Sequence, residues 1–349
     1  MARFLLLLGI LIYPLLFAAP VRAENSAVIF MYHRFGESDY PSTSISISQF
    51  EAHIEELKAG GYHVMALPDI VSALKTGAAL PDRAIGITID DAFLSVYTEA
   101  WPRLRAAGFP FTVFVATDPV DDKTRGYMTW RQISLLKEGG VTIGAHTASH
   151  AHMAGSGDPE NRQELEKSNG RFVAELGGVP DLFAYPYGEA GLETMALVRK
   201  AGHDAAFGQH SGVAGSHSNV YYLPRFALNE KYGEIDRFRL AANALALPVA
   251  DITPADPLID AGDDNPPAVG FTIKGGVAGL AKDGHNLSCF VSHEGKASVS
   301  ALGGEEGGDV RIEVRMTQPM PRGRTRLNCT LPASQGRWRW FGRQFIVNK

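Results

Sequence analysis

The sequence predicts an α/β fold in which a parallel (β/α) barrel is followed by a small all-β sandwich. Short apolar runs alternate with helical patterns from about residue 26 to residue 247. Repeated strand–helix units of this kind form a parallel sheet with helices outside, often closed into a barrel. From residue 268 onwards the apolar residues instead follow the two-residue period of β-strands. Residues 248–267 lie between these parts, are rich in Pro and Asp, and are predicted to be a linker.

The strands expected in the barrel are short apolar runs. They read AVIFMYH (27–33), YHVMAL (62–67), AIGITID (84–90), FTVFVAT (111–117), VTIGAH (141–146), LFAYP (182–186) and DAAFG (204–208). Amphipathic stretches separate them, such as residues 48–61, where Phe50, Ile54 and Leu57 share one helical face. Several of these stretches end in Gly, as helices often do.

Residues 1–23 have the pattern of a secretory signal peptide. Arg3 gives a positive start, residues 4–17 are apolar, and Val21-Arg22-Ala23 fits a small-residue cleavage site. The apolar run is short compared with the roughly 20 residues of a membrane-spanning helix, and an uncleaved anchor is the alternative interpretation. We expect an exported protein, periplasmic or secreted, with no stable membrane span after cleavage.

The C-terminal residues 268–349 contain both cysteines of the chain, Cys289 and Cys329. In an exported protein, an isolated pair of this kind is expected to form one disulfide, here within the sandwich. Trp338 and Trp340 share one face of a strand, which suits either sugar stacking or, as we prefer, packing into the core. This domain could also contact a partner in an export system.

The overall charge argues against one class of partner. The net charge is −5, the pI is about 6.1, and no dense basic stripe occurs. Nucleic acid is therefore not expected as the main partner.

Four of the expected strands end in polar or unusual groups, where parallel barrels carry their chemistry. These groups are His33, then Asp90 with Asp91, then His146 with His150, then the turn Tyr185-Pro186-Tyr187-Gly188. One Asp would suffice as a helix N-cap, so a second adjacent carboxylate suggests a nearby cation that relieves their repulsion.

Asp91, His146 and His150 offer one carboxylate and two imidazoles. This ligand set suits a divalent ion, most simply Zn²⁺, with Ni²⁺, Co²⁺ or Fe²⁺ as alternatives. Two surface histidines on a loop remain the other interpretation of the H-x-x-x-H spacing.

Pro186 and Tyr187 form either a simple turn or a rigid turn that directs the Tyr187 backbone N–H towards a substrate.

The motifs ITIDD, HTASH and AYPYG, in this order and spacing, resemble the first three motifs of the polysaccharide deacetylase family. This family is also known as the NodB-homology domain or carbohydrate esterase family four. The resemblance covers roughly residues 26–247, and we place the domain at residues 24–247. It implies a distorted (β/α) barrel, a divalent metal ion, and hydrolysis of N-acetyl groups on a polysaccharide.

Two departures from the family pattern affect the expected site. The family usually has Arg two positions before the Pro of the third motif, where this chain has Ala184. That Arg orients the general-base Asp, and Arg225 in the segment LPRF is our candidate to replace it. The usual Leu-x-x-His motif, which supplies the acid, has no clean counterpart in this chain.

The sequence also resembles circularly permuted deacetylases that act on exported poly-N-acetylglucosamine. In these proteins the acid-bearing strand comes first, in a Met-Tyr-His context, so His33 would take the place of the missing motif. His210, which also follows a short strand, is the competing candidate for the acid, whereas His203 and His217 are expected on the surface.

The resemblance implies roles for these residues in metal-dependent N-deacetylation. Asp91, His146 and His150 hold the metal, Asp90 is the general base, His33 is the general acid, and the Tyr187 N–H stabilises the oxyanion. One alternative is a glycan-binding protein without activity, which the missing third-motif Arg favours. Another is an O-deacetylase, and a distant third is an Fe²⁺ oxygenase, whose close His-x-Asp spacing is absent.

Overall fold

The computed structural model describes residues 25–348, except residues 263, 276, 278, 282, 283 and 304–307. The expected signal peptide, residues 1–23, lies outside the described residues. Within the described part of the chain, none of the helices has the length and apolar character needed to cross a bilayer.

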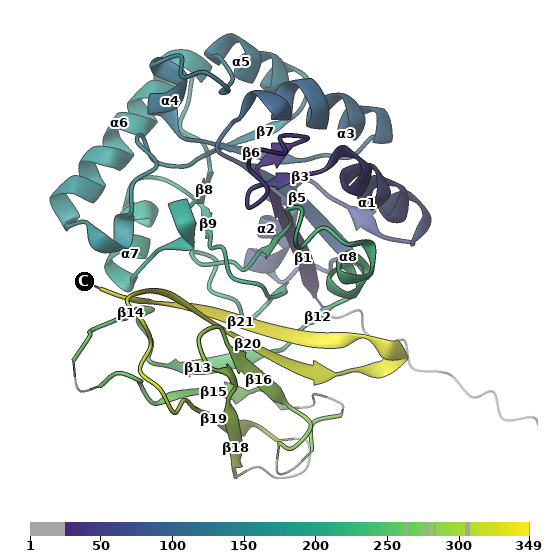
Figure 1. Cartoon of the computed structure of the whole chain (residues 1–349), viewed down its shortest axis with the longest axis vertical. Helices are drawn as coiled ribbons and strands as arrows, with labels where there is room; N and C mark the ends of the chain where they lie inside the picture. Colours follow the sequence, from purple (N-terminus) through teal and green to yellow (C-terminus); the bar gives the residue numbers. More distant parts are fainter. Residues whose placement is uncertain are drawn as a thin grey trace, which may run out of the picture.

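A curled, mainly parallel sheet forms the larger part of the molecule (Figure 1). Along the sheet the strands are β10 (Ala214–Gly215), β1 (Ser26–Tyr32), β5 (Ala84–Asp90), β6 (Thr112–Val115), β7 (Thr142–Ala145), β8 (Leu182–Ala184) and β9 (Ala205–Phe207). Two short strands join from the side: β11 (Phe226–Ala227) pairs with β1, and β4 (His63–Val64) pairs with β5. All of these strands run parallel to their neighbours except β10, which is antiparallel to β1. The predicted parallel barrel is confirmed.

Helices and short connections lie around this sheet (Figure 1). The α-helices are α1 (Ile47–Ala59), α2 (Leu67–Thr76), α3 (Trp101–Ala107), α4 (Thr117–Asp121), α5 (Trp130–Glu138), α6 (Asp158–Leu176), α7 (Leu192–Lys200) and α8 (Ile235–Ala242). The shorter elements are β2 (Arg34–Phe35), β3 (Ser44–Ile45), a π-helical turn η1 (Val96–Ala100), and the 3-10 turns η2 (Met153–Gly155), η3 (Pro186–Gly188) and η4 (Ser334–Gly336). Helix α1 begins at a capping box in which Ser46 and Gln49 satisfy each other's backbone N–H groups.

The strand register places the polar strand ends side by side. Every residue of β1 and of β5 is buried, as expected for parallel strands covered on both faces. Tyr32 of β1 pairs with Ile89 of β5, so the next residues along, His33 and Asp90, leave the sheet at the same edge. Strands β7 and β8 end at this edge as well.

The C-terminal part consists of two β-sheets. The six-stranded sheet contains β12 (Leu245–Ala246), β21 (Trp338–Val347), β20 (Gly323–Pro332), β16 (Ser288–Val291) and β17 (Gly295–Lys296), with β14 (Leu258–Ile259) beside β21. The four-stranded sheet contains β13 (Val249–Thr253), β15 (Val269–Ile273), β19 (Val310–Arg315) and β18 (Ser298–Leu302).

One apolar core joins these two sheets, so the predicted sandwich is confirmed. The core includes Phe271 and Ile312 from one sheet and Phe345 from the other. Cys289 and Cys329 are directly opposite each other on β16 and β20, and they form the predicted disulfide.

The segment expected to be a linker, residues 248–267, is more structured than its composition indicated. It contains β13 and β14, which pair with β15 and β21. Strand pairing to distant residues gives these Pro-rich stretches order that local sequence does not show.

The expectation that Trp338 packs into the sandwich core is wrong, because its side chain is exposed.

The long hairpin of β20 and β21 lies along the boundary between the sandwich and the barrel (Figure 1). Trp340 of this hairpin packs edge to face against Phe226 of β11, with ring centroids 5.0 Å apart. Strand β12 follows the last barrel helix and pairs in parallel with β21. The two parts of the chain are therefore joined by strand pairing as well as by side-chain packing.

Candidate active site

Three potential metal ligands converge where β5 and β7 end. The Oδ1 atom of Asp91 lies 3.3 Å from Nε2 of His146 and 3.2 Å from Nε2 of His150. One ligand atom from each of the three residues lies within 4.8 Å of the other two. We call these three residues the ligand cluster.

The buried atoms of the ligand cluster fit a bound cation. Nδ1 of His146 donates to the carbonyl oxygen of Ala184 at 2.7 Å, so in the neutral imidazole Nε2, which faces Asp91, is the nitrogen that carries the lone pair. Among the described residues, neither this Nε2 atom nor Oδ1 of Asp91 has a hydrogen-bond partner, although both are buried. Buried polar atoms are almost always satisfied, and a divalent ion between them would satisfy both.

A carboxylate from α6 holds the turn that carries His150. Oε2 of Glu164 accepts hydrogen bonds from the N–H groups of Ala148 and Ser149 at 3.0 and 2.8 Å. Oε1 of Glu164 accepts the Ser149 hydroxyl at 2.8 Å. Sequence reasoning did not identify Glu164, because nothing in its local pattern links it to a turn fifteen residues earlier.

Asp90 lies beside the ligand cluster and is clamped by Arg225. Nη1 and Nη2 of Arg225 donate to Oδ1 and Oδ2 of Asp90 at 2.7 and 2.8 Å. Both side chains are 0% exposed. Arg225 also donates to the carbonyl oxygen of Gly208 at 2.9 Å and to the Thr88 hydroxyl at 3.1 Å. The structure therefore brings Arg225 to the carboxylate that sequence reasoning assigned to it.

This clamp determines the charge state of Asp90. Burial alone would raise the pKa of the Asp90 carboxyl, because desolvation disfavours the charged form. The opposing charge and hydrogen bonds of Arg225, together with His146, outweigh burial and lower the pKa of Asp90. Asp90 is therefore ionised at neutral pH.

The two histidines considered as the acid occupy different surroundings. His33 lies next to Asp90 in the sheet register, and the charges of Asp91 and Asp90 act on it. Burial nevertheless lowers the pKa of His33. His210 is buried against Tyr222, with ring centroids 4.7 Å apart, and the charges acting on it are those of Arg343, Arg326 and Arg225. The ligand cluster is thus flanked by His33 and not by His210.

The turn after β8 places Tyr187 against the ligand cluster. Pro186 begins the 3-10 turn η3, and the ring of Tyr187 lies edge to face with His150, 4.6 Å between centroids. His152 stacks on the same Tyr187 ring, with 3.8 Å between ring centroids and an interplanar angle of 2°.

His203, expected on the surface, is buried, and its Nδ1 donates to the carbonyl oxygen of Pro180.

The loops of the site hold non-glycine residues in left-handed backbone conformations. These residues, with their φ angles, are Asp91 (75°), Ala92 (57°), Thr147 (64°), His150 (62°) and Tyr187 (59°). Such conformations typically cost about 1–3 kcal/mol each and concentrate at functional sites, where the surrounding structure imposes them. Their clustering at this edge of the sheet supports it as the candidate active site.

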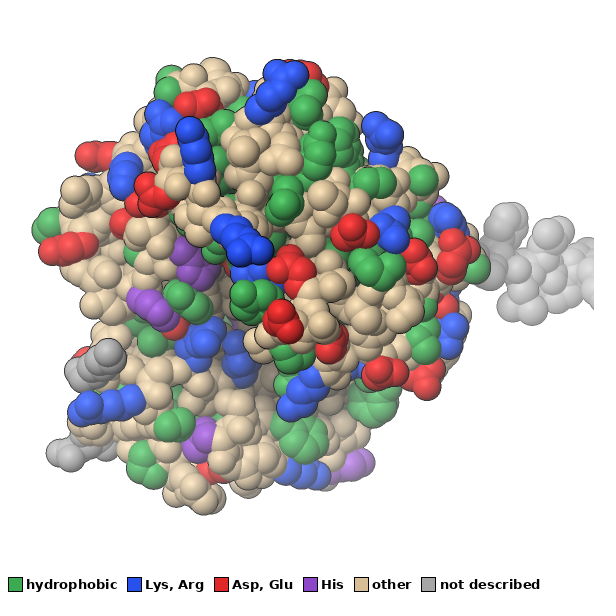
Figure 2. All heavy atoms as spheres, turned by 45° about the horizontal axis from the view of Figure 1, so that its top comes forward, with side chains coloured by type: hydrophobic (Ala, Val, Ile, Leu, Met, Phe, Trp, Pro, Cys, Tyr) green, Lys and Arg blue, Asp and Glu red, His purple; other side chains and the backbone are tan. Residues whose placement is uncertain are grey.

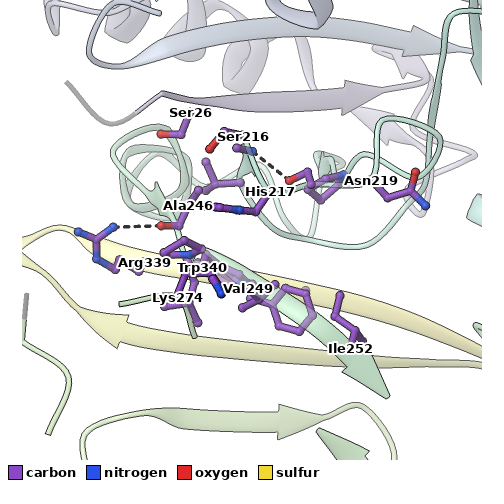
Figure 3. A pocket seen from close by; sticks show the side chains of 18 of the residues that line it. Ser26, Ser216, His217, Asn219, Ala246, Val249, Ile252, Lys274, Arg339 and Trp340 are labelled. Atoms are coloured by element: carbon purple, nitrogen blue, oxygen red, sulfur yellow. Dashed lines mark hydrogen bonds between the residues drawn. The ribbon is translucent and has the colours of Figure 1, made fainter. Parts of the chain in front are cut away.

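The site lies at the surface of the barrel and not in the cavity between the barrel and the sandwich. That cavity has a volume of about 480 Å³, and the residues lining it include Ser216, Asn219 and Trp340 (Figure 3). No member of the ligand cluster lines it. Figure 2 shows a hollow with His side chains and Lys or Arg side chains gathered around it.

Comparison with known proteins identifies the motif-bearing segment. Residues 77–206 match the family model described as polysaccharide deacetylase. This segment contains the ligand cluster, Asp90 and Tyr187, whereas His33 and Arg225 lie outside it. The poly-beta-1,6-N-acetyl-D-glucosamine N-deacetylase of Staphylococcus aureus is 25% identical over 233 residues, which cover 59% of this chain and 80% of that protein.

Solved structures share the fold of the barrel. The structure of IcaB from Ammonifex degensii has a TM-score of 0.55 and 24% identity, and the match covers 63% of this chain and 97% of that one. The Streptococcus pyogenes deacetylase PplD, solved with acetate, has a TM-score of 0.56 and 19% identity, covering 59% and 94% of the two chains. These matches cover nearly the whole length of both neighbours and confirm the barrel fold predicted from the motifs.

Proposed function

We propose that this chain removes N-acetyl groups from an extracytoplasmic polysaccharide of the N-acetylglucosamine type. The match of residues 77–206 to the polysaccharide deacetylase family model supports this proposal. The observation that carries the proposal is the ligand cluster lying beside an ionised Asp90. The ligand cluster can hold a metal ion. The carboxylate of Asp90 is not part of this cluster, and Arg225 orients it.

Asp91, His146 and His150 would hold the metal ion, for which zinc is the first candidate and nickel, cobalt and iron are the alternatives. When bound, such an ion supplies Lewis acidity and lowers the pKa of water at the site. Nδ1 of His146, fixed on the carbonyl oxygen of Ala184, keeps the imidazole in the orientation and tautomer that a ligand needs.

Asp90 acts as the general base and takes a proton from the attacking water. Arg225 keeps both Asp90 oxygens in place and keeps the carboxylate ionised. The backbone N–H of Tyr187 donates to the oxyanion of the tetrahedral intermediate. Removing one donor of this type typically costs about 2.7–4 kcal/mol of transition-state stabilisation.

His33 donates a proton to the departing sugar nitrogen. An amine leaves poorly without a proton, so an acid at this position favours N-deacetylation over O-deacetylation. Since burial lowers the pKa of His33, its protonated form is a strong donor. On this assignment kcat falls as pH rises through the lowered pKa of His33, because the acid loses its proton.

The alternative of an inactive glycan-binding protein loses its main support. It was favoured by the absence of Arg at position 184, but Arg225 supplies a bidentate cation to Asp90 from another loop. Metal binding alone would not require a buried, oriented carboxylate next to the ligand cluster.

The enzyme is proposed to work outside the cytoplasm. Residues 1–23 have a signal-peptide pattern, and the disulfide between Cys289 and Cys329 is typical of oxidising compartments. Contact of the sandwich with an export partner stays a prediction.

The test is acetate release by metal-loaded protein, residues 24–349, from β-1,6-linked N-acetylglucosamine oligomers. Acetate from the wild type but not from Asp90→Asn is the expected result, with His33→Ala reducing kcat as well. Acetate from acetylated xylan alone would instead indicate an O-deacetylase. No acetate from either substrate, despite one bound metal ion per chain, would support the binding protein.

A further inference from the structure

The Tyr187 turn, residues 185–189, adopts a conformation that its own sequence does not favour. Tyr187 has φ 59° and ψ 3°, and Gly188 follows at φ 68°. Within the turn, the Gly188 N–H donates to the Tyr185 carbonyl oxygen and the Glu189 N–H donates to the Pro186 carbonyl oxygen. Left-handed backbone at a tyrosine persists only where surrounding contacts impose it.

Residues of the sandwich provide such contacts to the backbone. Nε2 of Gln344 on β21 donates to the carbonyl oxygens of Tyr187 and Gly188, at 3.2 and 2.8 Å. Nη1 of Arg324 on β20 donates to the same Tyr187 oxygen at 3.2 Å. Gln344 is 0% exposed, so its amide cannot exchange these partners for bulk water. Two neighbouring carbonyl groups of the turn are thus fixed by residues more than 130 positions away.

A second set of contacts fixes the side chains around the turn. Nε of Arg324 lies 3.6 Å from Oε1 of Glu189. Oε2 of Glu189 lies 2.9 Å from Nδ1 of His152, whose ring is stacked on Tyr187. Arg324 also lies over the Tyr187 ring, 5.4 Å from its centroid. A continuous path of polar and stacking contacts therefore connects the sandwich to the ligand cluster through Tyr187 and His150.

We propose that Gln344 and Arg324 are positioning residues of the active site, and that the sandwich is required for turnover because it holds the Tyr187 turn. The inference rests on the proposed function, in which the Tyr187 N–H is the oxyanion donor. A donor must lie within a fraction of an ångström of its productive position, because misplacement by about 1 Å can cost on the order of 100-fold in rate.

The test compares Gln344→Leu and Arg324→Ala with the wild-type chain from residue 24. Leu keeps much of the Gln344 volume but donates no hydrogen bond. We expect kcat for acetate release to fall roughly 10- to 100-fold in Gln344→Leu, with KM and bound metal little changed. Arg324→Lys should restore part of the activity lost in Arg324→Ala. Arg322→Ala is the matched control and should retain full kcat, because Arg322 is an exposed arginine directly before β20 and two residues from Arg324.

Hydrogen exchange of the Tyr187 and Gly188 amides separates this inference from the proposed function. The amides should exchange at least about tenfold faster in Gln344→Leu than in the wild type and the Arg322→Ala control, because the open turn is more populated. Unchanged exchange together with unchanged kcat would overturn the positioning role. If exchange rises but the wild type releases no acetate from any glycan, the positioning role stands and the proposed function fails.

Discussion

Arg225 and Asp90 form a fully buried, bidentate ion pair between the residue before β11 and the last residue of β5, 135 positions apart in the sequence. The guanidinium group lies 5.4 Å from the ring of Phe114, which belongs to the same buried cluster as Ala184. An arginine expected at position 184 is thus replaced by one that enters the barrel interior from the start of β11. Asp90 thus has a bidentate cationic partner, although not from position 184.

Removing Arg225 should damage both stability and activity. Arg225→Ala leaves the Asp90 charge buried and unpaired, so we expect the free energy of unfolding to fall by about 3–5 kcal/mol. We expect kcat to fall on the order of 100-fold, because the base loses its orientation. Adding Ala184→Arg to this variant should recover part of the activity. Full activity in Arg225→Ala would show that Asp90 needs no orienting cation. The control is Arg239→Ala, because Arg239 is an exposed arginine.

Removing the metal ion should abolish acetate release and lower Tm. A ligand at 100 times its Kd stabilises the folded state by about 2.7 kcal/mol, and differential scanning calorimetry with and without Zn²⁺ measures this. His150→Ala should lose the stabilisation, whereas Asp90→Asn should keep it while losing activity. Equal stabilisation of His150→Ala and the wild type would show that the ion binds elsewhere.

Glu164 should strengthen metal binding although it is not itself a metal ligand. Its carboxylate fixes the Ala148 and Ser149 N–H groups that precede His150. We expect Glu164→Gln to weaken metal binding roughly tenfold, in the range typical of residues that orient ligands, as measured by competitive chelator titration. Glu166→Gln, at an exposed position on the same helix, should bind as the wild type does. A wild-type Kd in Glu164→Gln would mean that the turn holds its shape without this carboxylate.

Acid should destabilise the fold through two buried histidines. Burial lowers the pKa of His53 to about 4 and that of His210 to about 3, from an ordinary value of 6.5. These two histidines bind protons more readily in the unfolded chain than in the folded protein. Their contribution to the free energy of unfolding is therefore fully present above pH 6.5 and is lost as the pH falls towards 4. Each histidine contributes up to about 1.4 kcal/mol per pH unit.

Denaturant unfolding at several pH values between 7 and 4 measures this slope. His53→Gln should flatten it, since a glutamine amide can donate to the Gly233 carbonyl oxygen that Nε2 of His53 now contacts. His217→Gln, at an exposed position, should leave the slope unchanged. An identical slope in His53→Gln would place the acid sensitivity in other groups.

Loss of the disulfide should destabilise the sandwich. The bridge joins residues separated by 40 positions, and the chain-entropy model gives about 4 kcal/mol for a loop of this length. We expect Cys289→Ala/Cys329→Ala to lower the free energy of unfolding by about this amount in denaturant titrations. A change below about 1 kcal/mol would mean that the disulfide removes little conformational entropy from the unfolded chain.

The alignment of the site residues could be predicted because parallel strands end at one edge of a sheet. His33, Asp91 and His146 each follow a buried strand, and the structure brings their strand ends together. Even the pairing of Arg225 with Asp90 could be proposed, since a missing cation in a buried site demands a replacement. The alignment of the strand ends followed from the strand order, whereas Arg225 and the acid role of His33 came from the resemblance to the deacetylase family, whose usual Arg is Ala184 in this chain.

The rest could not be predicted because it depends on contacts between distant segments. Gln344 lies in an apolar strand pattern that gives no sign of a contact with Tyr187. His203 was expected on the surface, but tertiary packing buries it. The strands in residues 248–267 exist because β15 and β21 offer them edges to pair with.

The pairing of β12 with β21 determines how the two parts of the chain can move. Leu245 and Ala246 end the barrel sequence yet are hydrogen-bonded neighbours of Arg339 and Trp340. Nε of Arg337 also donates to the carbonyl oxygen of Asn243, and its Nη1 pairs with Asp82 at the surface of the barrel. A chain cut after residue 247 would therefore lose the partner strand of its own last residues. The sandwich is therefore fixed to the barrel by strand pairing, a hydrogen bond and an ion pair, and we expect the two parts to move as one rigid unit when a long polymer binds.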